Sequence, residues 1–295
     1  MSDNTTNTKK IVLPEKIGDY VVLSLLGQGS SAFVYKCFDP KHNCNVAIKE
    51  FLYHNEYVRE LSIIKKINHI SCMYFIEYYE TIYNGKTGYI VMELLDGNLY
   101  DLINTLVINN KMNIRTLKKI IFQLLEALIF LDDLGIVHFD IKPLNIGFTI
   151  NNDVITIKIF DFGLSETIDT VNLCNFQNEI ANGNIVKQTY CYRAFFDIKR
   201  FFGPTSDIWS LACIIYEIFT KNILFEEVLE DKSYEENIKS IMIALVKLEY
   251  QILTLDTNKI DEYEFFSFVY NMLTIPRPAR FIINDPYIEK IKNPI

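Results

Sequence analysis

The cysteine and histidine spacings of metal-binding modules are missing from this chain of 295 residues. Its six cysteines form no C-x-x-C pair, and its four histidines complete no zinc pattern. These absences argue against a zinc module and favour free thiols in a reducing compartment. We therefore expect an intracellular protein, in the cytoplasm, the nucleus or both. The cysteines are Cys37, Cys44, Cys72, Cys174, Cys191 and Cys213.

A long apolar run and an excess of basic residues are also missing. The longest apolar stretch, Ile120–Leu131, is interrupted by Gln123 and Glu126 and is too short to span a bilayer. The polar start of the chain lacks the apolar core of a secretory signal, and we expect residues 1–17 to form a disordered tail. The net charge of −8 argues against nucleic-acid binding. We expect neither a membrane nor a nucleic acid as partner.

The composition is that of a globular protein, with 49% hydrophobic and 22% charged residues. The length suits one large domain or two packed lobes. The abundance of Ile, Asn, Lys and Tyr is of the kind that an AT-rich genome produces, such as that of a parasite or a large DNA virus.

The first part of the chain has mainly strand patterns. Apolar alternation over Tyr20–Phe38, interrupted by glycines, predicts two strands and a tight loop, and Asn45–Phe51 predicts a third strand. Apolar spacing near 3.6 residues predicts a helix over Tyr57–Ile67. A hairpin is predicted from Phe75–Thr81 and Tyr89–Leu94, with Asn-Gly in the turn region.

Helical patterns dominate after Gly97. They predict helices over Met112–Leu134, Ile208–Phe219, Tyr234–Thr254 and Glu262–Leu273, with a hairpin over residues 145–150 and 154–160. The predicted fold class is α+β, with a β-rich lobe over residues 18–93, a hinge over 94–98 and a mainly helical lobe over 99–295. Ligands favour the cleft between two such lobes.

A glycine-rich segment joins the first two predicted strands. It reads Leu26-Gly27-Gln28-Gly29-Ser30-Ser31-Ala32-Phe33-Val34. Glycines allow backbone N–H groups to approach phosphate oxygens, although a hairpin turn without a ligand explains the segment equally well. Its place between two strands argues against a dinucleotide site of the kind that begins a helix.

A lysine lies inside the third predicted strand, in Val46-Ala47-Ile48-Lys49. A buried ammonium group needs an anionic partner, because leaving it unpaired is costly. Glu60 of the following helix and a phosphate can supply that partner, and Glu56 is the competing choice. The structural alternative is a lysine that reaches the surface from an edge strand.

Two further segments carry polar groups suited to phosphoryl transfer. In His138-Phe139-Asp140-Ile141-Lys142-Pro143-Leu144-Asn145, Asp140 can accept the proton of an attacking hydroxyl and Lys142 can neutralise a moving phosphoryl group. The amide oxygen of Asn145, and Asp161 in Ile159-Phe160-Asp161-Phe162-Gly163, can ligate Mg²⁺. Taken singly, each catalytic-loop residue is better explained as a loop cap, and the Asp-x-Gly sequence is common in turns. We interpret His138 as a packed core residue.

Taken in order, these motifs resemble the signature set of protein kinases, over roughly residues 18 to 290. The catalytic-loop form, residues 188–194 and Ala212-Cys213 are most similar to the SR-protein kinases of the CMGC group. The resemblance implies a serine/threonine kinase that transfers the γ-phosphate of Mg·ATP to a protein hydroxyl. It implies that Lys49 holds the α- and β-phosphates and pairs with Glu60. Asp140 would be the base, with Asn145 and Asp161 as the Mg²⁺ ligands.

The resemblance also implies how the adenine is held. Val34 and Ala47 would cover the ring, Met92 would be the gatekeeper, and the backbone of Glu93 and Leu95 would meet the adenine edge. The segment Ser206–Glu217 resembles the central helix of the large lobe, in which Asp207 would brace the catalytic-loop backbone.

The sequence departs from the family at the loop glycine and at the phosphate receptor. Ala32 stands for the third glycine, a change of one methyl group. Phe139 stands for the arginine that receives an activation-segment phosphate, so we expect activity without a phosphate on Thr167, Thr170 or Thr189.

A second departure is Ala194-Phe195-Phe196 in place of Ala-Pro-Glu. That glutamate pairs with a buried arginine, here Arg277 or Arg280, so either Asp197 replaces it or the arginine is solvated. The change supports the rival hypothesis of a pseudokinase that binds a nucleotide or a partner.

A run of acidic residues follows between Glu226 and Glu236. It predicts either a docking patch for a basic protein substrate or a solvated loop. We expect a monomer.

Overall fold

The computed structural model describes residues 13–68, 72–109, 113–168, 190–194, 203–229, 231–255 and 260–292. Residues 1–12, which make up most of the predicted disordered tail, lie outside these ranges. The chain divides into two compact units. The first comprises residues 1–58 and 77–94, and the second comprises residues 59–76 and 95–295.

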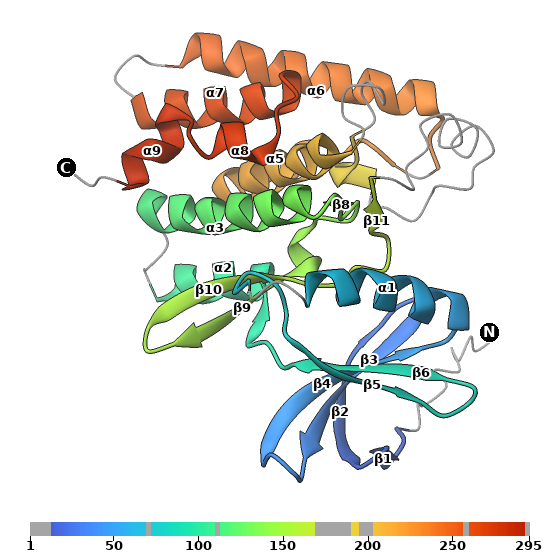
Figure 1. Cartoon of the computed structure of the whole chain (residues 1–295). Coiled ribbons are helices and arrows are strands. Elements are labelled where there is room, and N and C mark those ends of the chain that lie inside the picture. The colour runs from blue at the N-terminus through green and yellow to red at the C-terminus, as the bar shows by residue number, and fades with distance from the viewer. Residues whose placement is uncertain are drawn as a thin grey trace, which may run out of the picture. The chain divides into compact units, whose positions relative to one another are not determined.

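The first unit is built on an antiparallel sheet with the strand order β1-β2-β3-β4-β6-β5 (Figure 1). The three strands predicted over residues 20–51 are confirmed, and the sheet places β4 between β3 and β6. The strands are β1 (Lys16–Ile17), β2 (Tyr20–Gln28), β3 (Ala32–Asp39), β4 (Cys44–Phe51), β5 (Tyr78–Tyr83) and β6 (Gly88–Glu93).

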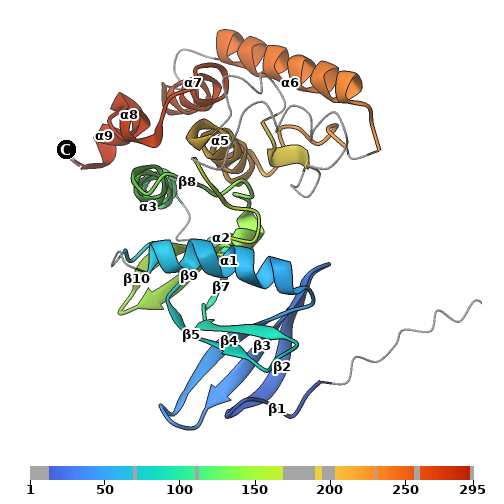
Figure 2. The same ribbon diagram turned by 45° about the vertical axis from the view of Figure 1, so that its right-hand side comes forward.

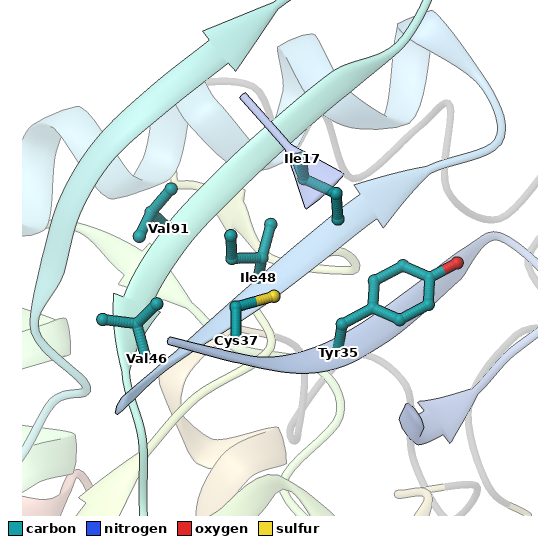
Figure 3. Packing of buried hydrophobic residues seen from close by; sticks show 6 residues of the cluster. All are labelled: Ile17, Tyr35, Cys37, Val46, Ile48 and Val91. Atoms are coloured by element: carbon teal, nitrogen blue, oxygen red, sulfur yellow. The ribbon is translucent and has the colours of Figure 1, made fainter. Parts of the chain in front are cut away.

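One face of this sheet carries an apolar core. Its side chains point toward one another in Figure 3, and because side chains alternate along a strand, the residues between them face the other side. Ala47 and Lys49 therefore lie on the face opposite Ile48. The core residues are Ile17, Tyr35, Cys37, Val46, Ile48 and Val91.

The second unit is mainly helical, and α1 (His54–Ile67) crosses the boundary between the units after Val58. Helix α5 packs against α3 and α7 (Figure 2). It contains the helix predicted over Ile208–Phe219, and most of its apolar side chains are buried. Its Trp209 stacks on Phe225, with ring centroids 5.3 Å apart. The other helices are α2 (Leu99–Ile108), α3 (Ile114–Asp133), α5 (Pro204–Thr220), α6 (Tyr234–Thr254), α7 (Ile260–Thr274), α8 (Ala279–Ile282) and α9 (Pro286–Lys292).

Short strands complete the second unit. One sheet has the order β10-β9-β7 and a second pairs β11 with β8. Two short 3-10 helices, η1 (Pro143–Asn145) and η2 (Tyr190–Tyr192), accompany them. The strands are β7 (Gly97–Asn98), β8 (Ile136–Val137), β9 (Ile146–Asn151), β10 (Val154–Ile159) and β11 (Glu166–Thr167).

One predicted strand begins too early. The sequence placed a strand over Phe75–Thr81, whereas β5 begins at Tyr78. Phe75 instead forms an isolated bridge with Ile159, and the Ile76 N–H donates to the Ile159 carbonyl at 3.1 Å. Phe75 and Ile76 thus pair with the end of β10 and not with the hairpin to which the prediction assigned them.

Among the described residues, no helix is both long and apolar enough to cross a bilayer.

Candidate active site

The predicted catalytic loop runs from the end of β8 to η1, and Asp207 of α5 holds its backbone. The Asp207 carboxylate accepts the N–H of His138 at 2.8 Å and that of Phe139 at 2.9 Å. This confirms the brace that the kinase resemblance implied. Burial raises the pKa of Asp207 to about 7, against the two backbone hydrogen bonds, which lower it. Phe139 has a φ of +62°, a strained conformation that these bonds help to hold.

His138 is a core residue, as predicted, with none of its surface exposed. Its Nδ1 accepts the Asp140 N–H at 3.2 Å, so the ring proton lies on Nε2, which donates to the Phe160 carbonyl at 3.2 Å. The ring also packs 4.9 Å from that of Phe162. The histidine therefore ties the catalytic loop to the segment after β10.

Asp140, Lys142 and Asn145 converge at one carboxylate oxygen. Asp140 Oδ2 is 2.8 Å from Lys142 Nζ and accepts from Asn145 Nδ2 at 2.8 Å. The same amide nitrogen donates to the Asp140 carbonyl at 2.9 Å. Because the amide nitrogen is used in this way, the Asn145 amide oxygen is the atom that remains to ligate a cation.

The charges around Asp140 favour a cation nearby. Burial raises its pKa, the neighbouring Lys142 lowers it, and the charge of Asp161 raises it again. Asp161 is the second residue after the end of β10 and has a φ of +65°. The Phe160 N–H donates to the Asn145 carbonyl at 3.1 Å, which brings the two predicted Mg²⁺ ligands to adjoining backbone segments.

Glu60 lies beside the Asp161-Phe162-Gly163 motif. A Cβ built on Gly163 would stand 3.3 Å from Asp161 Oδ1 and 3.3 Å from Glu60 Oε2. Glu60 is buried, whereas Glu56 is half-buried, one turn earlier in α1. Glu60 is thus the more buried of the two candidate residues, and its pairing with Lys49 stays a prediction.

In the first unit, Lys49 is 8% exposed, on a strand with neighbours on both sides. The alternative of an edge-strand lysine that reaches the surface is therefore wrong. Its Nζ lies 5.1 Å from the centroid of the Phe51 ring. In the strand register Val34 is opposite Lys49 and Met92 is opposite Ala47, so these four residues share one face of the sheet.

The glycine-rich segment closes the hairpin between β2 and β3. The Gly29 N–H donates to the Ala32 carbonyl at 2.9 Å, and Leu26 is half exposed. A Cβ added to Gly27 would meet no atom within 4 Å, so open space surrounds that glycine. Glu93 ends β6 and donates its N–H to the Glu77 carbonyl at 2.8 Å.

A cluster around Glu217 was not found by sequence reasoning. Glu217 accepts from the Tyr192 hydroxyl at 2.5 Å and from the Tyr100 hydroxyl at 2.8 Å. Ser210 Oγ donates to the Tyr192 carbonyl at 2.8 Å, which anchors η2 on α5. Burial raises the pKa of Tyr192 strongly. Tyr100 is distant in sequence from its partners, and no local pattern marks it.

Of the two alternatives for the late arginines, the structure favours the solvated one. Arg277 and Arg280 are both exposed, and Arg280 forms ion pairs of 2.8 Å with Asp132 and Asp133. Because the guanidinium groups reach the surface, the cost of an unpaired buried charge does not arise. Phe195, Phe196 and Asp197 lie outside the described residues, as do Thr170 and Thr189.

The described residues of the acidic run are surface groups with local roles. Glu227 pairs with Lys232 at 3.0 Å, and Glu236 forms a capping box with Ser233 at the start of α6. These contacts favour the solvated-loop interpretation. Glu230 lies outside the described residues.

Residues 20–287 match the model of the protein kinase domain. Since the match covers most of the chain, the chain belongs to the protein kinase family.

Curated relatives carry kinase names. A Dictyostelium discoideum protein named as a probable serine/threonine-protein kinase is 34% identical, over 72% of this chain and 34% of its own. Cyclin-dependent kinase-like 1 of Caenorhabditis elegans is 32% identical, over 70% and 56%. Cell division control protein 2 homolog 3 of Trypanosoma brucei brucei is 30% identical, over 72% and 66%. The chain thus spans between a third and two thirds of the length of these relatives.

Proposed function

We propose that the chain is an ATP-dependent serine/threonine protein kinase, which moves the γ-phosphate of Mg·ATP to a protein hydroxyl. The observation that carries the proposal is the convergence of Lys142 and Asn145 on Asp140, beside Asp161. Family membership supports it, since protein kinases use ATP and usually Mg²⁺.

The donor set of the second unit fits a hard cation. Asn145 offers an amide oxygen and Asp161 a carboxylate, and the charge repulsion between Asp161 and Asp140 is of the kind that a bound cation offsets. We assign Asn145 and Asp161 as the Mg²⁺ ligands. When bound, Mg²⁺ would neutralise the phosphate charge that develops during transfer.

The residues around Asp140 suit it to accept a proton. Its Oδ2 is oriented by the amide of Asn145, and the Lys142 ammonium lowers its pKa against the effect of burial. Burial is the larger effect and raises the pKa of Asp140 overall, which makes the carboxylate a stronger acceptor for the proton of the attacking hydroxyl. Lys142, held within 2.8 Å, would then neutralise charge on the transferred group.

We assign nucleotide binding to the first unit, and to Leu95 directly after it. Lys49 would hold phosphates, with Glu60 as its proposed acidic partner, and Val34, Ala47 and Met92 share its face of the sheet. Glu93 and Leu95 would meet the adenine edge. The phosphates would meet the backbone of Leu26, Gly27, Gln28, Gly29, Ser30, Ser31, Ala32 and Phe33.

Several finer assignments remain proposals. They are the lobes over residues 18–93 and 99–295 with a hinge over 94–98, a basic protein substrate, a monomeric state and an intracellular location without nucleic acid or membrane partners. The likeness to SR-protein kinases also stays a proposal, because the relatives named above carry other CMGC-like names.

The test is transfer from labelled ATP in the presence of Mg²⁺ to basic protein substrates. Asp140→Asn keeps the shape of the side chain but removes the base, so we expect turnover to fall by about 10²- to 10⁴-fold. Asp153→Asn, at an exposed acid in the turn between β9 and β10, is the matched control and should leave turnover unchanged. Undiminished transfer by Asp140→Asn would show that Asp140 is not the base.

The rival function is a pseudokinase that binds a nucleotide or a partner without transfer. The Phe195-Phe196 replacement motivates this rival. Binding and phosphate transfer are measured on the same sample of the unmodified chain. Nucleotide binding without transfer would favour the pseudokinase over the active kinase.

A further inference from the structure

Arg59 on α1 reaches the segment that follows the Asp161-Phe162-Gly163 motif. One nitrogen of its guanidinium group lies 2.5 Å from Glu166 Oε1 and donates to the Leu164 carbonyl at 3.4 Å. We propose that Arg59 and Glu166 are positioning residues, which fix α1 for catalysis through a charge that is built into the chain. The inference rests on the proposed kinase function, because it assigns these residues a role in that reaction.

The Arg59–Glu166 ion pair connects α1 to the catalytic loop through the pairing of β11 with β8. Glu166 begins β11 and is registered with Val137 of β8, and the Ile168 N–H donates to the Gly135 carbonyl at 2.7 Å. The residue after Val137 is His138, where the catalytic loop starts. Arg59 therefore ties α1 to the same backbone that carries Asp140.

The pair is placed to set the orientation of Glu60. Arg59 directly precedes Glu60 on α1, and a helix turns by about 100° per residue, so the two side chains point in different directions. Glu60 is buried beside Gly163, while Arg59 is partly exposed and reaches the segment that follows that glycine. Two bonds from Arg59 therefore limit rotation of this part of α1.

This connection needs no covalent modification. A phosphate-regulated segment is ordered when arginines bind the added charge. Here Phe139 offers no cation, and the carboxylate that Arg59 binds belongs to Glu166. The geometry thus gives a specific reason to expect activity without phosphorylation of Thr167.

Hydrogen exchange tests the proposal independently of activity. In Glu166→Gln and Arg59→Gln we expect faster exchange of the backbone amides in residues 59–67. The matched control is Glu227→Gln, which removes another ion pair of the second unit, with Lys232 in the loop before α6. The control should leave exchange in α1 unchanged.

Charge reversal supplies the kinetic test. Arg59→Glu and Glu166→Arg should each lower kcat/KM for ATP by about 2- to 5-fold, the size expected for a partly exposed ion pair. The double variant should recover at least half of that loss on a logarithmic scale, with KM for the protein substrate unchanged throughout.

The outcomes separate the Arg59–Glu166 proposal from the proposed kinase function. Loss in the single variants with recovery in the double variant supports the pair, whereas no recovery overturns it. Unchanged exchange in both glutamine variants also overturns it. If the unmodified chain transfers no phosphate, the proposed kinase function fails, and the exchange experiment still decides whether the pair holds α1.

Discussion

The two units hold their candidate residues by different physical means. In the first unit, strand alternation alone places Val34, Ala47 and Lys49 on one face, opposite a compact apolar core (Figure 3). In the second unit, Asp140 and Asp161 lie in loops whose backbone is held by side-chain hydrogen bonds. A site built on strands follows from a local pattern, whereas a site built on loops depends on partners that are distant in sequence.

We expect the largest effect from a substitution that removes the support of the catalytic loop. Asp207→Ala leaves two backbone N–H groups, those of His138 and Phe139, without their acceptor. At about 1–3 kcal/mol for each unsatisfied donor, we expect the free energy of unfolding to fall by about 2–6 kcal/mol. Urea denaturation measures it, with Asp231→Ala as the exposed control. A loss below about 1 kcal/mol would contradict the brace.

Alanine substitutions at one glycine of each unit extend the comparison between the units. A Cβ on Gly147 of β9 would collide with the Leu95 side chain and lie 3.1 Å from the Gly97 carbonyl oxygen. We expect Gly147→Ala to destabilise by about 1–3 kcal/mol through overpacking. Gly27→Ala, which meets no atom within 4 Å, should leave thermal unfolding nearly unchanged. Equal melting temperatures for both variants would show that β9 has more room than its contacts indicate.

The smallest expected effect concerns the Glu217 cluster. Tyr100→Phe removes one of the two hydroxyl donors to Glu217 and keeps the ring. We expect a loss of about 0.5–1.5 kcal/mol in the free energy of unfolding, the net value of one hydrogen bond. Tyr250→Phe, at a 68% exposed position of α6, is the matched control. Identical denaturation curves for the two variants would mean that the Tyr100 hydroxyl contributes nothing.

Local patterns predicted much of this fold. The periodic segment Tyr234–Thr254 became α6 with the same bounds, because a long amphipathic pattern needs no distant information. The two-residue strands β7, β8 and β11 were missed, because each exists only through its pairing partner. Helix α2 was missed as well, although the Asn98 and Asp101 side chains form a capping box that could have signalled its start.

The candidate residues were named from the sequence, and of their supports the Asp207 brace was implied by the family resemblance. The motifs pointed to Asp140, Asn145 and Asp161, since their spacing is local to two loops. The Tyr100 contact was not predictable, because it depends on how α2 and α5 meet. The solvated position of Arg280 was one of two alternatives left open by the sequence, and its contact with α3 could not be read from a local pattern.

Phe139 and Asp161 both have left-handed backbones, and neither is a glycine. Such a conformation costs about 1–2 kcal/mol per residue, so each segment would relax if its hydrogen bonds were broken. Both loops are therefore held in a strained conformation by the hydrogen bonds around them. A disturbance that frees them from Asp207 and His138 would therefore displace Asp140 and Asp161 by a small local relaxation, well before the surrounding helices unfold.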